Sequence, residues 1–177
     1  MYFKQKNKTA VRSQHMIADA LFRLMKRKLF QQISVTEICE EAAIGRKTFY
    51  RNFELREDVI DFQLDLMLED YKTELAALSF EQYLHHHFAF IQENADCFIA
   101  LYQSGLSMLA NKKFSALLPE TMPVWSADPI EQEYRCAYII SGIEAIQRVW
   151  ISRGCRETID DIVAIAVRAQ DKQVPLW

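Results

Sequence analysis

Breaks in regular structure are rare along this chain: only four glycines and four prolines are spread over 177 residues. Long helices tolerate few such residues, whereas folds built of many short strands need one at nearly every turn. Half of the residues are apolar and a quarter are charged, which excludes a disordered or collagen-like chain. No run of alternating apolar and polar residues indicates a strand, so we expect an all-α fold.

Apolar residues recur at helical spacing through most of the chain. Ile17, Leu21 and Leu24 mark one face of a first amphipathic helix, and basic residues occupy its other positions. Prolines and polar capping residues separate the later helices. The expected helices cover residues 9–29, 35–42, 46–53, 55–77, 80–93, 95–103, 106–118, 129–152 and 158–170.

The helix expected at 55–77 is apolar on two sides, which is typical of a helix packed between two bodies. We expect it to join an N-terminal head, residues 1–54, to a C-terminal body, residues 55–177. Charge divides the chain near the same point. Residues 1–58 carry twelve Lys and Arg against seven Asp and Glu, a net charge of +5, whereas residues 59–177 carry nine against seventeen, a net charge of −8. A basic head on an acidic body is typical of a protein that binds nucleic acid through one end.

The head contains a segment with the form of a helix-turn-helix. Ser34 and Glu37 have the spacing of a capping box and start one short helix. Ala43, Ile44 and Gly45 then make a tight turn, and a second short helix with basic residues follows. Two short helices joined by such a turn are the usual form of this DNA-binding motif.

The sequence from Ser34 to Val59 resembles the signature of the TetR/AcrR family of bacterial transcriptional regulators. The match departs from the family pattern at Ala43, where glycine is usual, and at Leu55, where a small polar cap is usual. The resemblance implies a helix-turn-helix head that binds double-stranded operator DNA, carried on a helical dimerisation body. The matching positions are Val35, Thr36, Ile38, Ala42, Ile44, Thr48, Phe49, Tyr50, Arg51, Phe53, Arg56 and Glu57.

The resemblance also implies that Thr36, Tyr50 and Arg56 contact DNA phosphates. The second short helix opens with residues whose side chains would enter the major groove. Because Arg and Lys can donate to both O6 and N7 of guanine, one of the first two residues of this helix is the expected base reader. Phe49 and Phe53 are expected in the core. The predicted DNA-binding residues are Thr36, Arg46, Lys47, Thr48, Tyr50, Arg51 and Arg56.

The body is rich in aromatic residues, and the resemblance implies that a body of this kind often holds an effector pocket. Phe98, Tyr102, Trp125 and Tyr138 are the candidates to line it, with ordinary core packing as the alternative for each. A pocket needs a few polar groups among apolar walls. Because the body has no net-basic patch, a neutral or cationic effector is favoured over an anionic one.

Small residues recur at i, i+4 and i+8 in the helix expected at 129–152, which lets another helix approach closely. With the last helix, this stripe predicts a homodimer held by a four-helix bundle. The alternative is that the stripe packs within one chain. The predicted interface residues are Ala137, Ser141, Ala145, Ile146, Ile162 and Ala166.

The sequence gives little support for a metal site or for catalysis. His85, His86 and His87 are neighbours on a helix, where consecutive side chains point about 100° apart and do not share one metal ion. We expect them to be exposed or half-buried histidines without a metal. No catalytic or phosphate-binding motif occurs, so we expect neither an enzyme nor a cofactor. The N-terminus lacks the pattern of a signal peptide and no apolar run is long enough to span a membrane, so we expect a cytoplasmic protein with reduced thiols. The cysteines are Cys39, Cys97, Cys136 and Cys155.

Together these observations predict a homodimeric regulator, acting as a repressor, that binds a palindromic operator and is released by a small molecule. The alternative is a regulator on the same scaffold that a partner protein controls, because a short body leaves little room for a pocket. A cavity of several hundred Å³ with polar anchors would favour the small molecule, and a closed body would favour the partner protein.

Overall fold

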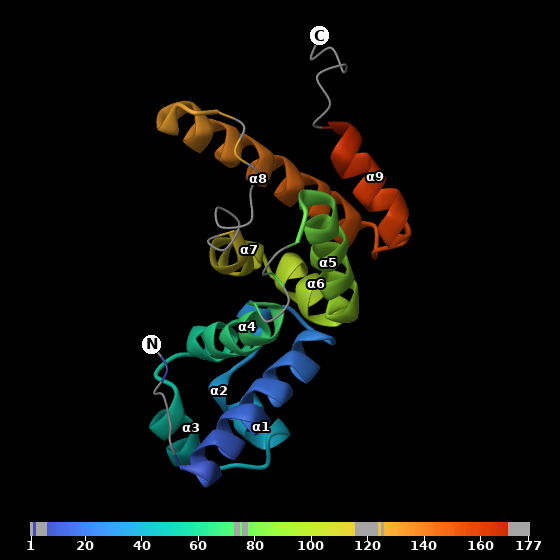
Figure 1. The fold of residues 1–177 in the computed structure, drawn as a ribbon. Coiled ribbons are helices and arrows are strands. Elements are labelled where there is room, and N and C mark those ends of the chain that lie inside the picture. Colours follow the sequence, from blue (N-terminus) through green and yellow to red (C-terminus); the bar gives the residue numbers. More distant parts are fainter. Residues whose placement is uncertain are drawn as a thin grey trace.

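The computed structural model of the chain describes residues 2, 7–72, 75, 78–115, 124 and 126–169. Within them the all-α expectation is confirmed, and β structure is limited to one isolated bridge between Tyr2 and Phe53 (Figure 1). The elements are α1 (Lys8–Met25), a 3₁₀ helix η1 (Phe30–Gln32), α2 (Val35–Glu41), α3 (Arg46–Asn52), α4 (Arg56–Lys72), α5 (Phe80–Glu93), α6 (Ala95–Gln103), α7 (Ser107–Ser115), α8 (Pro129–Ser152) and α9 (Ile159–Ala169).

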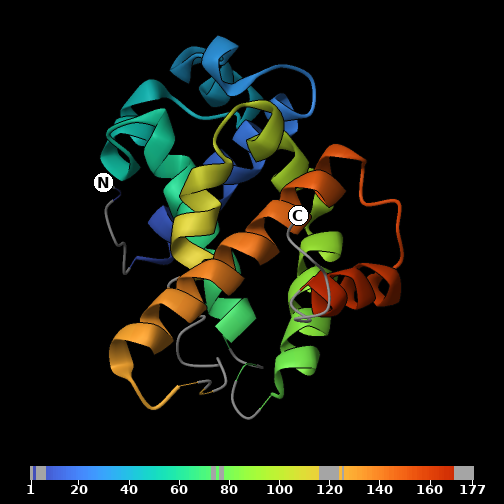
Figure 2. The same ribbon diagram turned by 90° about the horizontal axis from the view of Figure 1, so that it is seen from above.

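Helices α1 to α3 lie at one end of the molecule and α8 and α9 at the other, with α5 to α7 between them (Figure 1). The long helix α8 crosses the body, as the view from above shows (Figure 2). Helix α9 packs against α5 and α8. Among the described helices, none combines the length and the apolarity that a membrane crossing requires.

The capping box predicted for α2 is present. The Ser34 hydroxyl accepts a hydrogen bond from the Glu37 amide (3.2 Å), and the Glu37 carboxylate accepts one from the Ser34 amide (2.8 Å). These bonds satisfy amides that have no partner within the helix. They start α2 at the position that the sequence indicates.

Helix α2 ends in a Schellman motif. The amide of Ala43 donates to the carbonyl of Glu40 (3.1 Å), and the amide of Ile44 donates to the carbonyl of Cys39 (2.9 Å). Ala43 has a φ of 53°, in the left-handed region that disfavours a residue with a Cβ atom. A glycine would adopt this backbone conformation without strain, whereas alanine here carries strain.

Replacing Ala43 with glycine is expected to stabilise the protein. Relief of the left-handed strain, about 1–2 kcal/mol, outweighs the entropy cost of a more flexible unfolded chain, about 0.4–1 kcal/mol. The net gain of about 0.5–1 kcal/mol corresponds to a melting temperature about 2 °C higher. Ala89→Gly within α5 is the control and is expected to lower stability by about 1 kcal/mol. A melting temperature for Ala43→Gly that is unchanged or lower would contradict this account.

Helix α4 packs against α1 of the head and α7 of the body. Leu55 supplies no capping side chain at its start. Instead the buried carboxylate of Asp58 accepts hydrogen bonds from the amides of Leu55 (2.9 Å) and Glu54 (3.1 Å). This carboxylate half of a capping box replaces the missing polar cap and fixes where α4 leaves the head. Val59, Ile60, Phe62, Leu64, Met67 and Tyr71 bury their side chains on this helix.

Candidate nucleic-acid interface and body surfaces

Helix α3 packs against α1 and α2, and its Phe49 side chain is completely buried. The opposite side of the helix is open. Arg46, Lys47 and Arg51 are exposed there, and Tyr50 retains 53% of its accessible surface. This is the arrangement that a recognition helix needs, because the packed side fixes its direction and the open side can enter a groove.

Two predicted DNA-binding residues meet across the turn. The guanidinium Nη2 of Arg46, at the start of α3, donates a hydrogen bond to the hydroxyl of Thr36, in the first turn of α2. The starts of the two helices therefore share one surface. Thr48 lies half-buried next to it.

Several cations in the last turn of α1 and directly after it are neutralised within the head. Arg23 and Arg27 both bind the Glu41 carboxylate, each at 2.8 Å, and their hydrogen bonds lower the pKa of Glu41. Lys28 binds Glu37, which with the Ser34 bonds lowers the pKa of that carboxyl to about 2. These ion pairs reinforce the contact between α1 and α2. Arg46 and Lys47 of α3 are exposed on the open side of the head.

Arg56, an expected phosphate contact, makes several contacts within the chain. Its Nη1 atom donates to the carbonyls of Phe30 (3.2 Å) and Ile33, and its guanidinium lies 4.8 Å from the centre of the Phe30 ring. Arg56 therefore holds the segment between α1 and α2 against the start of α4. The position of Arg56 in the sequence does not give the direction of its side chain.

In the body, the third residue of the histidine run is buried. His87 is 6% exposed; its Nδ1 lies 3.1 Å from the Tyr71 hydroxyl and its Nε2 lies 3.1 Å from Oε1 of Gln147. The Tyr83 hydroxyl is 3.4 Å from the same Nδ1. Burial lowers the pKa of His87 to about 4, so the ring is neutral at pH 7. The amide oxygen of Gln147 can only accept, so Nε2 carries the proton and Nδ1 accepts one from tyrosine.

The three histidines point to different surroundings. Nδ1 of His85 lies 3.7 Å from an Asp160 carboxylate oxygen, and Nε2 of His86 lies 3.3 Å from the Tyr71 carbonyl. Among the described residues no group of three His, Cys, Asp or Glu side chains has the arrangement of a metal site. The sequence expectation of exposed or half-buried histidines was wrong for His87. Tyr83 from the preceding turn of α5, Tyr71 from α4 and Gln147 from α8 surround it.

The cavity beside His87 has a volume of only about 10 Å³. Phe98, one of the predicted pocket residues, lines it together with Phe90 and Phe114. Tyr102 is half-buried elsewhere, and Trp125 lies outside the described residues. The polar residues on the cavity wall are His87, Asn111, Ser115, Glu144 and Gln147.

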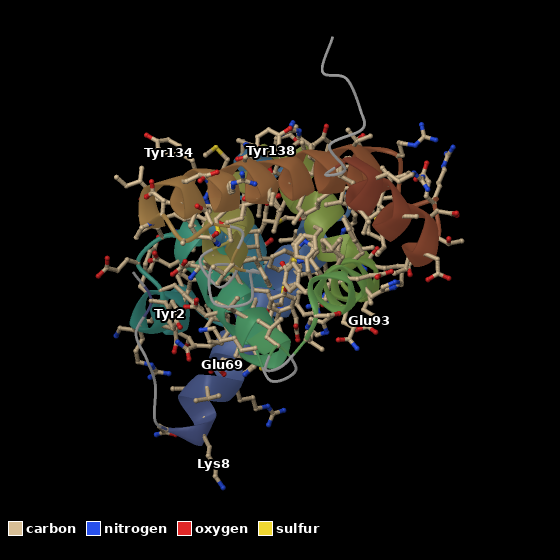
Figure 3. The ribbon with its side chains drawn as sticks, turned by 45° about the horizontal axis from the view of Figure 1, so that its top comes forward. Tyr2, Lys8, Glu69, Glu93, Tyr134 and Tyr138 are labelled. Atoms are coloured by element: carbon tan, nitrogen blue, oxygen red, sulfur yellow. The ribbon has the colours of Figure 1, made fainter. Side chains whose placement is uncertain are left out.

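Tyr138 does not belong to that cavity. It is 63% exposed and points outward from α8, as does Tyr134 (Figure 3). A more open groove of about 330 Å³ does occur between α4 and α5, and Phe90 lines both it and the cavity. The groove is formed by Met67, Tyr71, His86, Ala89, Phe90, Glu93 and Asn94.

The predicted interface stripe lies largely on the surface of α8. Ala137 and Ser141 are exposed, and Ala145 and Ile146 are half-buried in an open groove of about 430 Å³ between α8 and α9. Ile162 forms part of the groove floor. Ala166 is completely buried inside the chain, which corrects its assignment to the interface. The groove is formed by Ala145, Ile146, Val149, Trp150, Arg153, Glu157, Ile162 and Ile165.

Comparison with known proteins shows which solved structures share this fold. No protein-family model matches the sequence, and no curated protein matches it. Among solved structures, the chain is similar to a TetR transcriptional regulator from Streptococcus agalactiae, with 19% identity and a TM-score of 0.72 over 94% of this chain and 98% of that one. It is also similar to the fatty acid degradation regulator FadR from Bacillus halodurans, with 14% identity and a TM-score of 0.71 over 97% and 100%.

A third similar structure is DhaS, the activator of a dihydroxyacetone kinase operon, with 22% identity and a TM-score of 0.63 over 90% of this chain and 94% of that one. These three proteins are regulators of transcription by name, and the match extends over nearly their whole length. At these identities the likeness shows the fold alone: the chain has the all-α fold of TetR-type transcriptional regulators.

Proposed function

We propose that the chain is a DNA-binding transcriptional regulator, and not an enzyme, which binds a palindromic operator in the cytoplasm as a homodimer. The observation that carries this proposal is the open, cationic side of α3, set on a helix-turn-helix whose other side is packed into the head. The fold of known regulators supports it. DNA affinity would come mainly from phosphate neutralisation and sequence preference from base contacts by α3.

Selection of bound fragments from random DNA by the purified protein tests this function. We expect a palindrome whose half-sites are about 34–36 Å apart, or a multiple of one helical turn, because two heads related by a two-fold axis read it. Affinity should fall steeply with salt concentration. Recovery of no enriched sequence, with binding independent of salt, would reject the proposal.

Single substitutions on α3 are expected to separate base readers from backbone contacts. Lys47→Ala and Arg46→Ala should each reduce the preference for operator over random DNA by about 1–3 kcal/mol. Tyr50→Phe, which removes only a hydroxyl, should weaken binding to both DNAs to a similar degree. Fluorescence anisotropy on the two DNAs measures both quantities. Full operator preference in both cation variants would mean that other residues read the bases.

The dimer would form through the apolar groove between α8 and α9. Val149 is 58% exposed there and Ile165 is 40% exposed, so a second copy would cover apolar surface that water now contacts. Pairing of these two helices from each chain would give a four-helix bundle.

For control of DNA binding we propose repression relieved through the body. The cavity of about 10 Å³ holds no more than about one water, so a small neutral or cationic effector would need to enlarge it or to occupy the groove between α4 and α5. The small size of this cavity supports the second candidate, control by a partner protein. The exposed apolar residues at the start of α8, Ile130 and Tyr134, provide surface for such a partner. Calorimetry against a library of small molecules, compared with affinity capture on the purified dimer, would separate the two.

A further inference from the structure

We propose that Thr36 orients the Arg46 guanidinium for base reading, so that the sequence preference of the head depends on a hydroxyl of α2 as well as on the cations of α3. This inference rests on the proposed function and deepens it. Thr36 acts on the bases through Arg46, which makes it a positioning residue in addition to the phosphate contact expected of it.

The bond between the two residues spans the turn of the helix-turn-helix. Nη2 of Arg46 donates to Oγ1 of Thr36, and Thr36 is half-buried whereas Arg46 is exposed. The Arg46 charge also lies close enough to Cys39 to oppose the rise that burial causes in the pKa of its thiol. Thr36 and Cys39 are three positions apart on α2, so they lie on the same side of that helix. The guanidinium therefore lies along this side of α2.

A neutral partner leaves the charge of Arg46 available for DNA. The carboxylates of Glu37 and Glu41 on α2 are bound by cations from the last turn of α1 and directly after it. The group on α2 that accepts from Arg46 is a hydroxyl, which fixes the direction of the guanidinium without neutralising it. A guanidinium held in this way retains its attraction for the DNA polyanion.

The hydrogen-bonding capacity of the two side chains lets both act on DNA at once. A threonine hydroxyl has one donor and two acceptor sites, so Thr36 can accept from Arg46 and still donate its proton to a phosphate oxygen. A guanidinium has five N–H donors in one plane, and the bond to Thr36 leaves an adjacent pair for O6 and N7 of guanine. The result is a chain of hydrogen bonds from a phosphate through Thr36 and Arg46 to a base edge.

Orientation matters because an exposed arginine is costly to immobilise. Its side chain loses more rotamer freedom than most others when it is fixed, and holding it in place before DNA arrives reduces that cost. The benefit is realised where a guanine meets the guanidinium, and much less on random DNA. The Thr36 hydroxyl thus contributes to sequence preference, which a phosphate contact by itself does not.

Thr36→Val tests the bond, because valine has nearly the same shape as threonine and lacks the hydroxyl. We expect a few-fold loss of affinity for random DNA, from the lost phosphate contact, and a further loss of about tenfold in the preference for the selected operator. Thr36→Ser keeps a hydroxyl and should retain the preference. Fluorescence anisotropy on the two DNAs measures both quantities. A wild-type operator preference in Thr36→Val would overturn the proposal.

Double-mutant cycles separate this bond from general damage to the surface. In a protein that already carries Arg46→Ala, Thr36→Val should leave the remaining operator preference unchanged, because the group that it orients is gone. Lys47→Ala, at the next position of α3, is the matched control, and in that background Thr36→Val should still lower the preference about tenfold. The same effect of Thr36→Val in both backgrounds would show that it does not act through Arg46.

A measurement without DNA distinguishes failure of this inference from failure of the proposed function. NMR relaxation at Nε should show Arg46 more ordered than the exposed Arg12 in the wild type, and equally mobile in Thr36→Val. If Thr36→Val does not fold, Thr36→Ala removes the same hydroxyl with a better helix former. If the wild type selects no DNA, the proposed function fails, while the order of Arg46 still decides whether Thr36 fixes it. An Arg46 side chain as mobile in the wild type as in the variant would overturn the proposal.

Discussion

Replacing Ala145 with arginine is expected to produce a folded monomer that has lost specific operator binding. Ala145 lies in the open groove between α8 and α9, where a long charged side chain would be buried without a partner if a second copy packed there. A single recognition helix reads only a few base pairs, so its affinity should approach the non-specific level, about a thousandfold weaker or more. Light scattering and operator titration measure the two effects.

Gln92→Arg is the control, because it places the same charge on an exposed position of α5, away from the groove. It should remain a dimer with wild-type affinity. A dimer of Ala145→Arg with unchanged operator affinity would locate the interface elsewhere. An unfolded variant, detected by circular dichroism, would mean that the stripe on α8 belongs to the core of one chain.

The free energy of unfolding is expected to fall as the pH decreases below about 6.5, because of His87. Burial lowers its pKa to about 4 in the folded state, whereas the unfolded chain has the ordinary value of about 6.5. Between these values the unfolded state binds the proton and the folded state does not, so acid favours unfolding. The contribution to stability lost between pH 7 and pH 5 is about 2 kcal/mol.

His87→Gln is expected to remove this dependence while lowering the overall stability. The ring is surrounded by the hydroxyls of Tyr71 and Tyr83 and the amide of Gln147, none of which ionises in this range, so the loss belongs to His87. His85→Gln on the same helix is the control and should retain the wild-type slope. Urea unfolding at pH 5, 6 and 7 measures it. A wild-type slope in His87→Gln would show that another group is responsible.

The sequence by itself determined the helical architecture, because helix signals are local. The bonds between Ser34 and Glu37, and the turn at Ala43 to Gly45, involve residues within a few positions of one another. Apolar spacing likewise identified the buried side of α3, with Phe49 and Phe53 in the core. Each of these features depends on backbone geometry that a short segment adopts wherever it lies in the fold.

Only the tertiary structure decided where the longer side chains point. Arg56 turns to the carbonyls of η1, His87 is buried against Gln147 sixty positions away, and Tyr138 faces outward. The bond between Ser104 and Phe30 joins segments seventy-four positions apart. Periodicity gives the side of a helix on which a residue lies, but not which distant element covers that side. Burial, hydrogen-bond partner and pKa follow from that packing, so they were decided when the helices came together.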